Sequence, residues 1–171
     1  MLLQGKKAII TGGTRGIGFS VAEVFLKNGA SVALFGSRQE TVDKALAQLK
    51  AENPAWEVIG MAPDLTDYAA LDAAFSEVEN RFGRIDILVN NAGISAREPL
   101  YEYTPEAFQR IMDLNVTAVF NGCRAAAIRM KAQGGGSIIN TSSMVSLYGQ
   151  PSGVGYPTSK FAVNGMTRSL A

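Results

Sequence analysis

The sequence predicts an α/β fold in which a doubly wound parallel sheet lies between two layers of helices. Short apolar runs alternate along the 171 residues with longer segments of helical periodicity, and strict alternation of strands and helices builds a parallel sheet. Runs such as AII (8–10) and ILV (87–89) are continuously apolar, as expected of strands that helices cover on both faces. No repeat or linker-like tract interrupts the pattern, so residues 1–171 are expected to form one domain.

Each element follows from its local pattern. Strands are expected at Lys7–Thr11, Ser31–Phe35, 56–62, 86–90 and 137–141. Helices are expected at 17–28, 39–52, 66–83 and 104–131, and a last one begins near Tyr156 and Pro157. The helix at 104–131 has a start signal, because Thr104 suits the N-cap and Pro105 the first helical position.

The composition excludes several kinds of chemistry. There is no histidine and one cysteine, Cys123, which excludes a Ser-His-Asp triad, a Cys-His pair and the usual zinc sites. No metal site is therefore expected. Sixteen basic and 15 acidic residues are scattered without a basic run, so no nucleic-acid partner is expected.

The same composition bears on location. No apolar run approaches the roughly 18 residues of a membrane helix, so no membrane association is expected. The start, MLLQGKKAIITGG, becomes charged too soon for a signal peptide. A single cysteine fits a reducing setting, and the chain is expected to be cytoplasmic.

A glycine-rich turn follows the first strand. TGGTRGIG carries Gly12, Gly13, Gly16 and Gly18 and leads into a helix. Such a turn lets the backbone approach a pyrophosphate, while the helix N-terminus supplies free N–H groups and the positive end of a dipole. The spacing GxxxGxG differs from the usual GxGxxG, and the alternative is a tight turn with glycines for geometry alone. The turn favours a Rossmann-type dinucleotide site.

The end of the second strand bears on the choice of cofactor. A carboxylate there would bind the ribose 2′-hydroxyl of NAD, but LFGSRQE places Ser37 and Arg38 at this point. Arg38 and Arg15 could instead pair with a 2′-phosphate. The pattern favours NADP(H) over NAD(H); the alternative is that both arginines are solvated surface charges.

Six motifs occur in order along the chain: TGGTRGIG, DLTD (64–67), NNAG (90–93), LNV with Asn115, NTSS ending in Ser143, and YPTSK (156–160). With this spacing the chain resembles the short-chain dehydrogenase/reductase family over its whole length. Within the family it is similar to 3-oxoacyl-carrier-protein reductases and to bile-acid hydroxysteroid dehydrogenases. Members of the family extend well past the position of Ala171. The resemblance therefore implies a Rossmann-type sheet truncated after the fifth strand and part of the following helix.

The resemblance also implies roles for individual residues. The catalytic set would be Asn115, Ser143, Tyr156 and Lys160. The cofactor would be bound by Gly12, Thr14, Arg15, Gly16, Ile17, Gly18, Ser37, Arg38, Asp64, Leu65, Asn90, Ala92, Gly93, Tyr156 and Lys160. Asn91 would tie neighbouring strands together, and Asn115 would bind a water that links Lys160 to solvent. A homo-oligomer, dimer or tetramer, is implied as well.

The residues themselves support a proton path. Tyr156 and Lys160 are spaced i, i+4 and share a helix face. A phenol's ordinary pKa of about 10 is high for proton exchange near neutrality, and a nearby ammonium favours the phenolate. Ser143 could hold a substrate oxygen beside the phenol. Taken singly, the pair could be a surface pair, Ser143 a turn cap and Asn115 a packing residue.

These patterns predict an oxidoreductase that interconverts a secondary alcohol and a ketone, of the hydroxysteroid or 3-oxoacyl type, with a nicotinamide cofactor. The alternatives are a non-catalytic dinucleotide-binding protein and an inactive fragment of such an enzyme. Residues between the serine and the tyrosine, among them Leu147 and Tyr148, could line a substrate pocket or form a packed loop.

Overall fold

The computed structural model describes residues 1–171 and contains one five-stranded sheet. All neighbouring strands are parallel, in the order β3-β2-β1-β4-β5. The strands are β1 (Lys7–Thr11), β2 (Ser31–Phe35), β3 (Val58–Met61), β4 (Ile87–Asn90) and β5 (Ser137–Asn140). The chain runs outward from β1 through β2 to β3, then returns to the other side of β1 for β4 and β5. This reversal creates a crevice at the carboxyl ends of β1 and β4, where open α/β sheets bind ligands.

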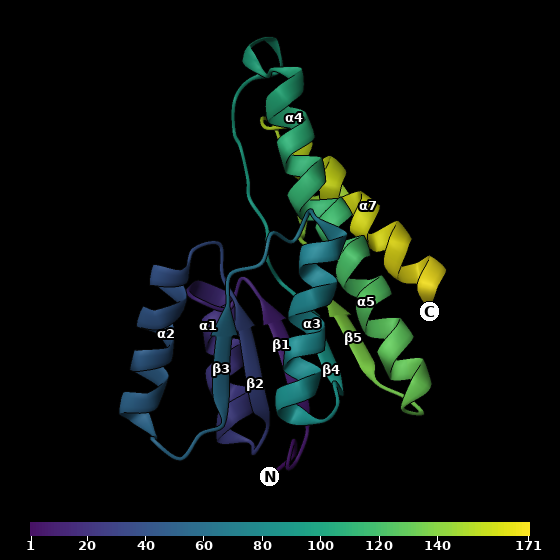
Figure 1. Cartoon of the computed structure of the whole chain (residues 1–171). Helices are drawn as coiled ribbons and strands as arrows, with labels where there is room; N and C mark the ends of the chain where they lie inside the picture. The colour runs from purple at the N-terminus through teal and green to yellow at the C-terminus, as the bar shows by residue number, and fades with distance from the viewer.

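Helices cover both faces of the sheet (Figure 1). They are α1 (Gly16–Lys27), α2 (Gln39–Glu52), α3 (Tyr68–Phe82), α4 (Pro105–Met112), α5 (Ala118–Ala132), α6 (Val145–Tyr148) and α7 (Gly155–Leu170), with η1 (Leu100–Glu102) and η2 (Asp113–Thr117). Helices α1 and α2 pack on one face, while α3 and α5 pack on the other. The three-layer arrangement confirms the predicted fold class.

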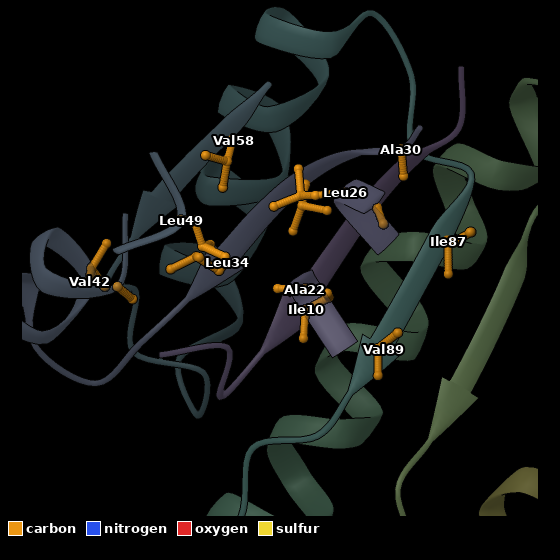
Figure 2. Packing of buried hydrophobic residues seen from close by; sticks show 13 residues of the cluster. Ile10, Ala22, Leu26, Ala30, Leu34, Val42, Leu49, Val58, Ile87 and Val89 are labelled. Atoms are coloured by element: carbon orange, nitrogen blue, oxygen red, sulfur yellow. The ribbon is translucent and has the colours of Figure 1, made fainter. Parts of the chain in front are cut away.

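Successive side chains of the central strands point into two apolar cores, one on each face of the sheet. Val32 belongs to the core beneath α1 and α2. Leu34 points into the same core (Figure 2). Ala33 and Phe35 point the opposite way, and the ring of Phe35 meets that of Phe75 edge to face, with centroids 6.0 Å apart. The strands are thus apolar on both faces, which is why their sequences show continuous apolar runs.

Local signals fix where two helices begin and one ends. Asp67 Oδ1 accepts hydrogen bonds from the backbone N–H groups of Ala69 and Ala70 at the start of α3. Thr104 Oγ1 accepts one from Ala107 N at the start of α4. Gly83 ends α3 with a φ of 81°, a backbone conformation that glycine adopts without a Cβ penalty.

The region 104–131 differs from the single helix that the sequence predicted. Helix α4 ends at Met112, a π-helical segment occupies Asp113–Thr117, and α5 begins at Ala118. A π turn accommodates one extra residue within a helix. Sequence periodicity did not reveal it, because α4 and α5 each keep their own apolar stripe. The short helix α6 was not predicted either, and β3 is shorter than 56–62.

Strand β5 forms one edge of the sheet, since it pairs with β4 alone. Its Ile139 is 46% exposed. Helix α4 and the start of α7 stand beyond the carboxyl ends of the strands (Figure 1). None of the helices combines the length and the apolar character needed to cross a bilayer.

Candidate active site

A cleft of about 690 Å³ lies at the carboxyl ends of the strands. Ten residues expected to bind a cofactor line it: Gly12, Thr14, Arg15, Gly16, Ile17, Ser37, Asp64, Leu65, Ala92 and Gly93. They come from the segments that follow β1, β2, β3 and β4, so the fold gathers four separate parts of the sequence. The cleft therefore lies at the sheet's topological switch point, where the glycine turn predicted a dinucleotide.

The glycine turn packs too tightly for side chains at two positions. A Cβ on Gly12 would lie 2.9 Å from the Ala92 Cα, and one on Gly18 would lie 2.2 Å from the Gly12 carbonyl oxygen. Gly18 therefore lies behind the cleft lining and brings α1 close to the turn. Helix α1 begins at Gly16, and its N-cap residue Arg15 makes no side-chain capping bond. The first N–H groups of α1 consequently remain available to an anion.

Asn91 holds the turn to the neighbouring strand, as expected. Its Nδ2 donates to the carbonyl oxygens of Thr11 and Gly12, at 3.1 and 3.2 Å. In return, the Thr11 hydroxyl oxygen accepts from the backbone N–H groups of Asn91 and Ala92. The ends of β1 and β4 are thereby locked together on the floor of the cleft.

The rim of the cleft carries two cations without carboxylate partners. Arg15 and Arg38 are exposed and form no salt bridge or side-chain hydrogen bond. Ser37 lines the cleft, whereas Arg38 lies just outside the lining as the N-cap residue of α2. Because neither guanidinium is neutralised within the protein, both are free to meet an anionic group.

Asp64 marks the far side of the cleft. Its Oδ1 accepts hydrogen bonds from the Thr66 backbone N–H at 2.9 Å and the Thr66 hydroxyl at 2.7 Å. These bonds lower the pKa of the Asp64 carboxyl. The group is thus held as a carboxylate in a fixed orientation beside Leu65.

Asn90 lies elsewhere than the resemblance implied. Its side chain is 3% exposed and turns between α5 and β5, where Nδ2 donates to Asn140 Oδ1 at 2.9 Å. It packs so closely on Gly122 that a Cβ there would lie 2.5 Å from Asn90 Oδ1. Its carbonyl oxygen accepts from Thr141 N. The expected cofactor contact is therefore not available to this side chain, which serves the packing of α5 against the sheet.

The four residues expected to be catalytic come from η2, the segment after β5, and α7. Lys160 is 4% exposed, and its Nζ donates to the Thr141 carbonyl oxygen at 2.7 Å. The same nitrogen lies 5.7 Å from the centroid of the Tyr156 ring. Burial lowers the pKa of the Lys160 ammonium, because a low-dielectric site disfavours the charged form.

Gly93 connects this group to the cleft. A Cβ on Gly93 would lie 3.2 Å from Asn115 Oδ1 and 3.8 Å from Lys160 Nζ. Gly93 also lines the cleft, so Asn115 and Lys160 lie directly behind its lining at this point, whereas neither they nor Ser143 and Tyr156 line the cleft themselves. Residues 93, 115 and 160 of the sequence are thus brought to one point.

The Asn115 side chain binds the protein through both of its polar atoms. Its Oδ1 accepts from Ile94 N at 2.9 Å, and its Nδ2 donates to the carbonyl oxygen of Ile94 and the hydroxyl of Ser159. Ser159 in turn donates to the Tyr156 carbonyl oxygen at 2.7 Å. The Asn115 amide therefore anchors the loop after β4 to α7, and the water expected at this residue stays a prediction.

Ser143 and Tyr156 keep their polar groups available. The hydroxyl oxygen Oγ of Ser143 accepts only a 3.4 Å hydrogen bond from Val145 N. The hydroxyl proton of Ser143 is therefore free to be donated. The Tyr156 hydroxyl makes no hydrogen bond within the protein, and both residues are half-buried. Leu147 and Tyr148 are exposed at 59% and 82%, so α6 offers apolar surface rather than a packed loop.

Sequence reasoning missed two polar residues that hold the site together. Ser159 lies between Tyr156 and Lys160 in the YPTSK motif, and its place within that motif was the available signal. Asn121 donates to carbonyl oxygens in the segment that lines the cleft after β3. The only signal in the sequence was an amide side chain at a position where the helical pattern is otherwise apolar.

Known proteins resemble the chain in both sequence and structure. A 3alpha-hydroxysteroid dehydrogenase of Mediterraneibacter gnavus is 63% identical over all 171 residues, which cover 68% of that relative. A 3-alpha-(or 20-beta)-hydroxysteroid dehydrogenase of Mycobacterium bovis is 40% identical over 99% of this chain and 63% of its own length. The crystal structure of an NAD+-bound xylitol dehydrogenase covers all of this chain and 65% of that one, with a TM-score of 0.95 and 32% identity.

The chain thus spans about two thirds of the length of these relatives. The family model for short chain dehydrogenase matches residues 6–171. With the parallel sheet, the glycine turn and the buried lysine beside the tyrosine, this match shows that the chain belongs to the short-chain dehydrogenase family.

Proposed function

We propose that the protein is an NADP(H)-dependent oxidoreductase that interconverts a secondary alcohol and a ketone, with Tyr156 as the acid and base. The observation that carries this proposal is the position of Lys160. Its buried ammonium lies against Tyr156 and reaches the cleft through Gly93. A cation is costly to bury without a strong partner, and a developing phenolate would supply one.

The residues of the cleft fit a nicotinamide dinucleotide. The turn at Gly12 and Gly18 leaves no space for side chains, and the uncapped start of α1 suits a pyrophosphate. Asp64 offers a hydrogen-bond acceptor for an adenine amino group. When bound, the cofactor would donate or accept the hydride at the substrate carbon.

The chain's own residues would supply the proton path. The Ser143 hydroxyl would donate to the substrate oxygen and hold it beside Tyr156. Tyr156 would give its proton to that oxygen during reduction of a ketone, or take it during oxidation of an alcohol. Lys160 would stabilise the resulting phenolate, and Asn115 would fix α7 against the loop after β4.

The test is a Tyr156→Phe variant assayed with NADPH and a panel of ketones. Turnover should fall by about a hundredfold to ten-thousandfold, because general acid–base catalysis contributes roughly 10²–10⁴. Cofactor affinity should stay within about twofold of the unmodified protein. The matched control is Tyr101→Phe, since that side chain is 99% exposed and lies outside the proposed proton path. Undiminished turnover in Tyr156→Phe would refute the assignment.

The unpaired charges of Arg15 and Arg38 support NADP(H) as the cofactor. An arginine can bind a 2′-phosphate with two parallel hydrogen bonds, and no carboxylate lies between the end of β2 and the start of α2 to bind a 2′-hydroxyl. Arg38→Ala should weaken NADPH about tenfold and leave NADH unchanged, since a charge-assisted hydrogen bond contributes about 1.5–3 kcal/mol. Arg81→Ala, which removes an exposed arginine paired with Glu77, is the control. Tighter binding of NADH than of NADPH by the unmodified protein would contradict the assignment.

The substrate class that we propose is a hydroxysteroid. It is supported by the 63% identical relative named 3alpha-hydroxysteroid dehydrogenase and by the apolar surface of α6 beside Ser143. A 3-oxoacyl substrate is the competing class, supported by a 33% identical relative named 3-oxoacyl-[acyl-carrier-protein] reductase from Chlamydia muridarum. A turnover assay with both classes separates them. Cofactor binding without turnover on either would instead favour a non-catalytic role.

We also propose that the protein forms a homo-oligomer. Large apolar side chains are about half exposed on two helices, Phe120 and Ile128 on α5 and Phe161 on α7. Exposed large apolar side chains on these two helices would be covered by a second copy of the chain. Light scattering of the purified chain should give the mass of a dimer or tetramer, and the mass of a monomer would contradict it.

A further inference from the structure

Two asparagines, six residues apart, hold the two loops on either side of the cleft. Asn115 in η2 binds the backbone of Ile94 in the loop after β4. Asn121 in α5 binds the carbonyl oxygens of Leu65 and Thr66 in the loop after β3, at 3.1 and 3.2 Å. Ile94 and Leu65 both line the cleft. One helical stretch therefore supports the cleft at two separate points.

The Asn121 bonds lead directly to a group that faces the cleft. Thr66, whose carbonyl oxygen accepts from Asn121, donates its backbone N–H and its hydroxyl to Asp64 Oδ1. Both of these donors go to one carboxylate oxygen, and the backbone N–H of Asp67 makes a weaker contribution to the same carboxyl group. The orientation of this carboxyl group thus depends on Thr66, and that of Thr66 on Asn121.

The setting of Asn121 makes this support strong. The residue is 6% exposed, and a buried amide hydrogen bond is costly to lose because the freed groups cannot all turn to water. The loop itself is largely exposed around Asp64 and Thr66. A rigid helix thus holds a loop that has few other contacts to fix it.

We propose that Asn121 is a positioning residue for the adenosine half of the cofactor site, acting through Thr66 on Asp64. This inference rests on the proposed function, since it presumes that a dinucleotide occupies the cleft. The nicotinamide half depends on Asn115, Tyr156 and Lys160. Loss of Asn121 should therefore weaken one half of the ligand and spare the other.

The experiment compares Asn121→Leu, which keeps the number and branching of the side-chain heavy atoms and removes both donor bonds, with a control. The control is Gln133→Leu at the C-cap of α5, where Nε2 donates to the carbonyl oxygens of Ile85 and Gly135 and Oε1 accepts from Ile85 N. It removes amide hydrogen bonds to the backbone as well, but at the opposite end of the sheet. Calorimetry measures the affinity of the full chain for two probes, ADP and reduced nicotinamide mononucleotide.

We expect Asn121→Leu to bind ADP about tenfold more weakly, which corresponds to roughly 1.4 kcal/mol, the scale of one or two hydrogen bonds. Its affinity for the mononucleotide should stay unchanged. Gln133→Leu should lower the melting temperature comparably and bind both probes as the unmodified protein does. Thr66→Val, an exposed substitution that removes one donor to Asp64, should lower the affinity for ADP about threefold. This variant replaces Asn121→Leu in the experiment if Asn121→Leu does not fold.

Equal weakening of both probes would show a general structural role and overturn the inference. Unchanged ADP affinity in Asn121→Leu, or in Thr66→Val if the former does not fold, would overturn it as well while leaving the proposed function intact. Failure of the unmodified protein to bind either probe would refute the dinucleotide site itself, and the inference with it.

Discussion

The contact between Gly18 and Gly12 gives a sharp test of the glycine turn. A Cβ at position 18 would lie 2.2 Å from the Gly12 carbonyl oxygen and 2.5 Å from Asn91 Nδ2, whereas ordinary contact begins at 3.4 Å. Gly18→Ala must therefore push the start of α1 away from the turn by about 1.2 Å, the difference between 3.4 and 2.2 Å. Alternatively, it must break the hydrogen bond from Asn91 to Gly12.

Overpacking of this kind costs about 1–3 kcal/mol of unfolding free energy. The displaced N–H groups are also those proposed to meet the pyrophosphate, so we expect the affinity for NADPH to fall at least about tenfold. Fluorescence titration measures the affinity, and urea denaturation measures the stability.

A matched control separates the two effects. Gly83 ends α3 with a φ of 81°, and a Cβ there meets no atom within 4 Å. Gly83→Ala should cost about 1 kcal/mol through its left-handed backbone, and it should leave NADPH affinity unchanged. If Gly18→Ala bound NADPH within twofold of the unmodified protein, the reasoning about the turn would be refuted.

Three further predictions concern the core, a helix cap and the buried lysine. Phe75→Ala should lower the unfolding free energy by about 3–5 kcal/mol, because Phe75 is fully buried against Phe35; Tyr101→Ala, at a side chain 99% exposed, should change it by less than about 0.5 kcal/mol in the same urea experiment. Asp67→Ala should cost about 1 kcal/mol by urea denaturation, since it leaves two N–H groups at the start of α3 without their acceptor; no loss would show that the cap is not needed. Burial lowers the pKa of Lys160 from its ordinary 10.5, so between the two values the unfolded chain binds more protons and stability rises with pH. The unfolding free energy of Lys160→Met should lack this rise between neutral and alkaline pH. If the unfolding free energies of the variant and the unmodified protein rose equally with pH, the prediction would be contradicted.

The sequence predicted most of the fold because its signals are local. The strands Lys7–Thr11 and Ser31–Phe35 and the helix Gln39–Glu52 have the expected bounds, since apolar runs and helical spacing depend on neighbouring residues alone. The cleft residues were predicted from the order of the motifs, and ten of them line it. The bounds of these strands and of this helix follow from a short window of sequence, whereas the cleft residues follow from a family resemblance over the whole chain.

What the sequence could not predict depends on contacts between distant elements. Asn90 stands in a motif associated with the cofactor, yet its side chain is turned inward because Gly122 of α5 leaves room for it there. The role of Asn121 depends on the carbonyl oxygens of a loop 55 residues away. Neither orientation is encoded in nearby residues, so the three-dimensional packing was needed to show it.

The π turn at Asp113–Thr117 has a consequence for protein engineering. Since an α-helix advances about 100° per residue, one extra residue puts α4 and α5 out of phase by about that angle. Deleting a single residue there would close the wide turn into a regular helix and would displace Asn115, whose amide binds Ile94 and Ser159. A one-residue deletion in this segment should therefore lower stability more than several substitutions on its surface do. In sequence design, the apolar positions of α4 and α5 must be counted separately.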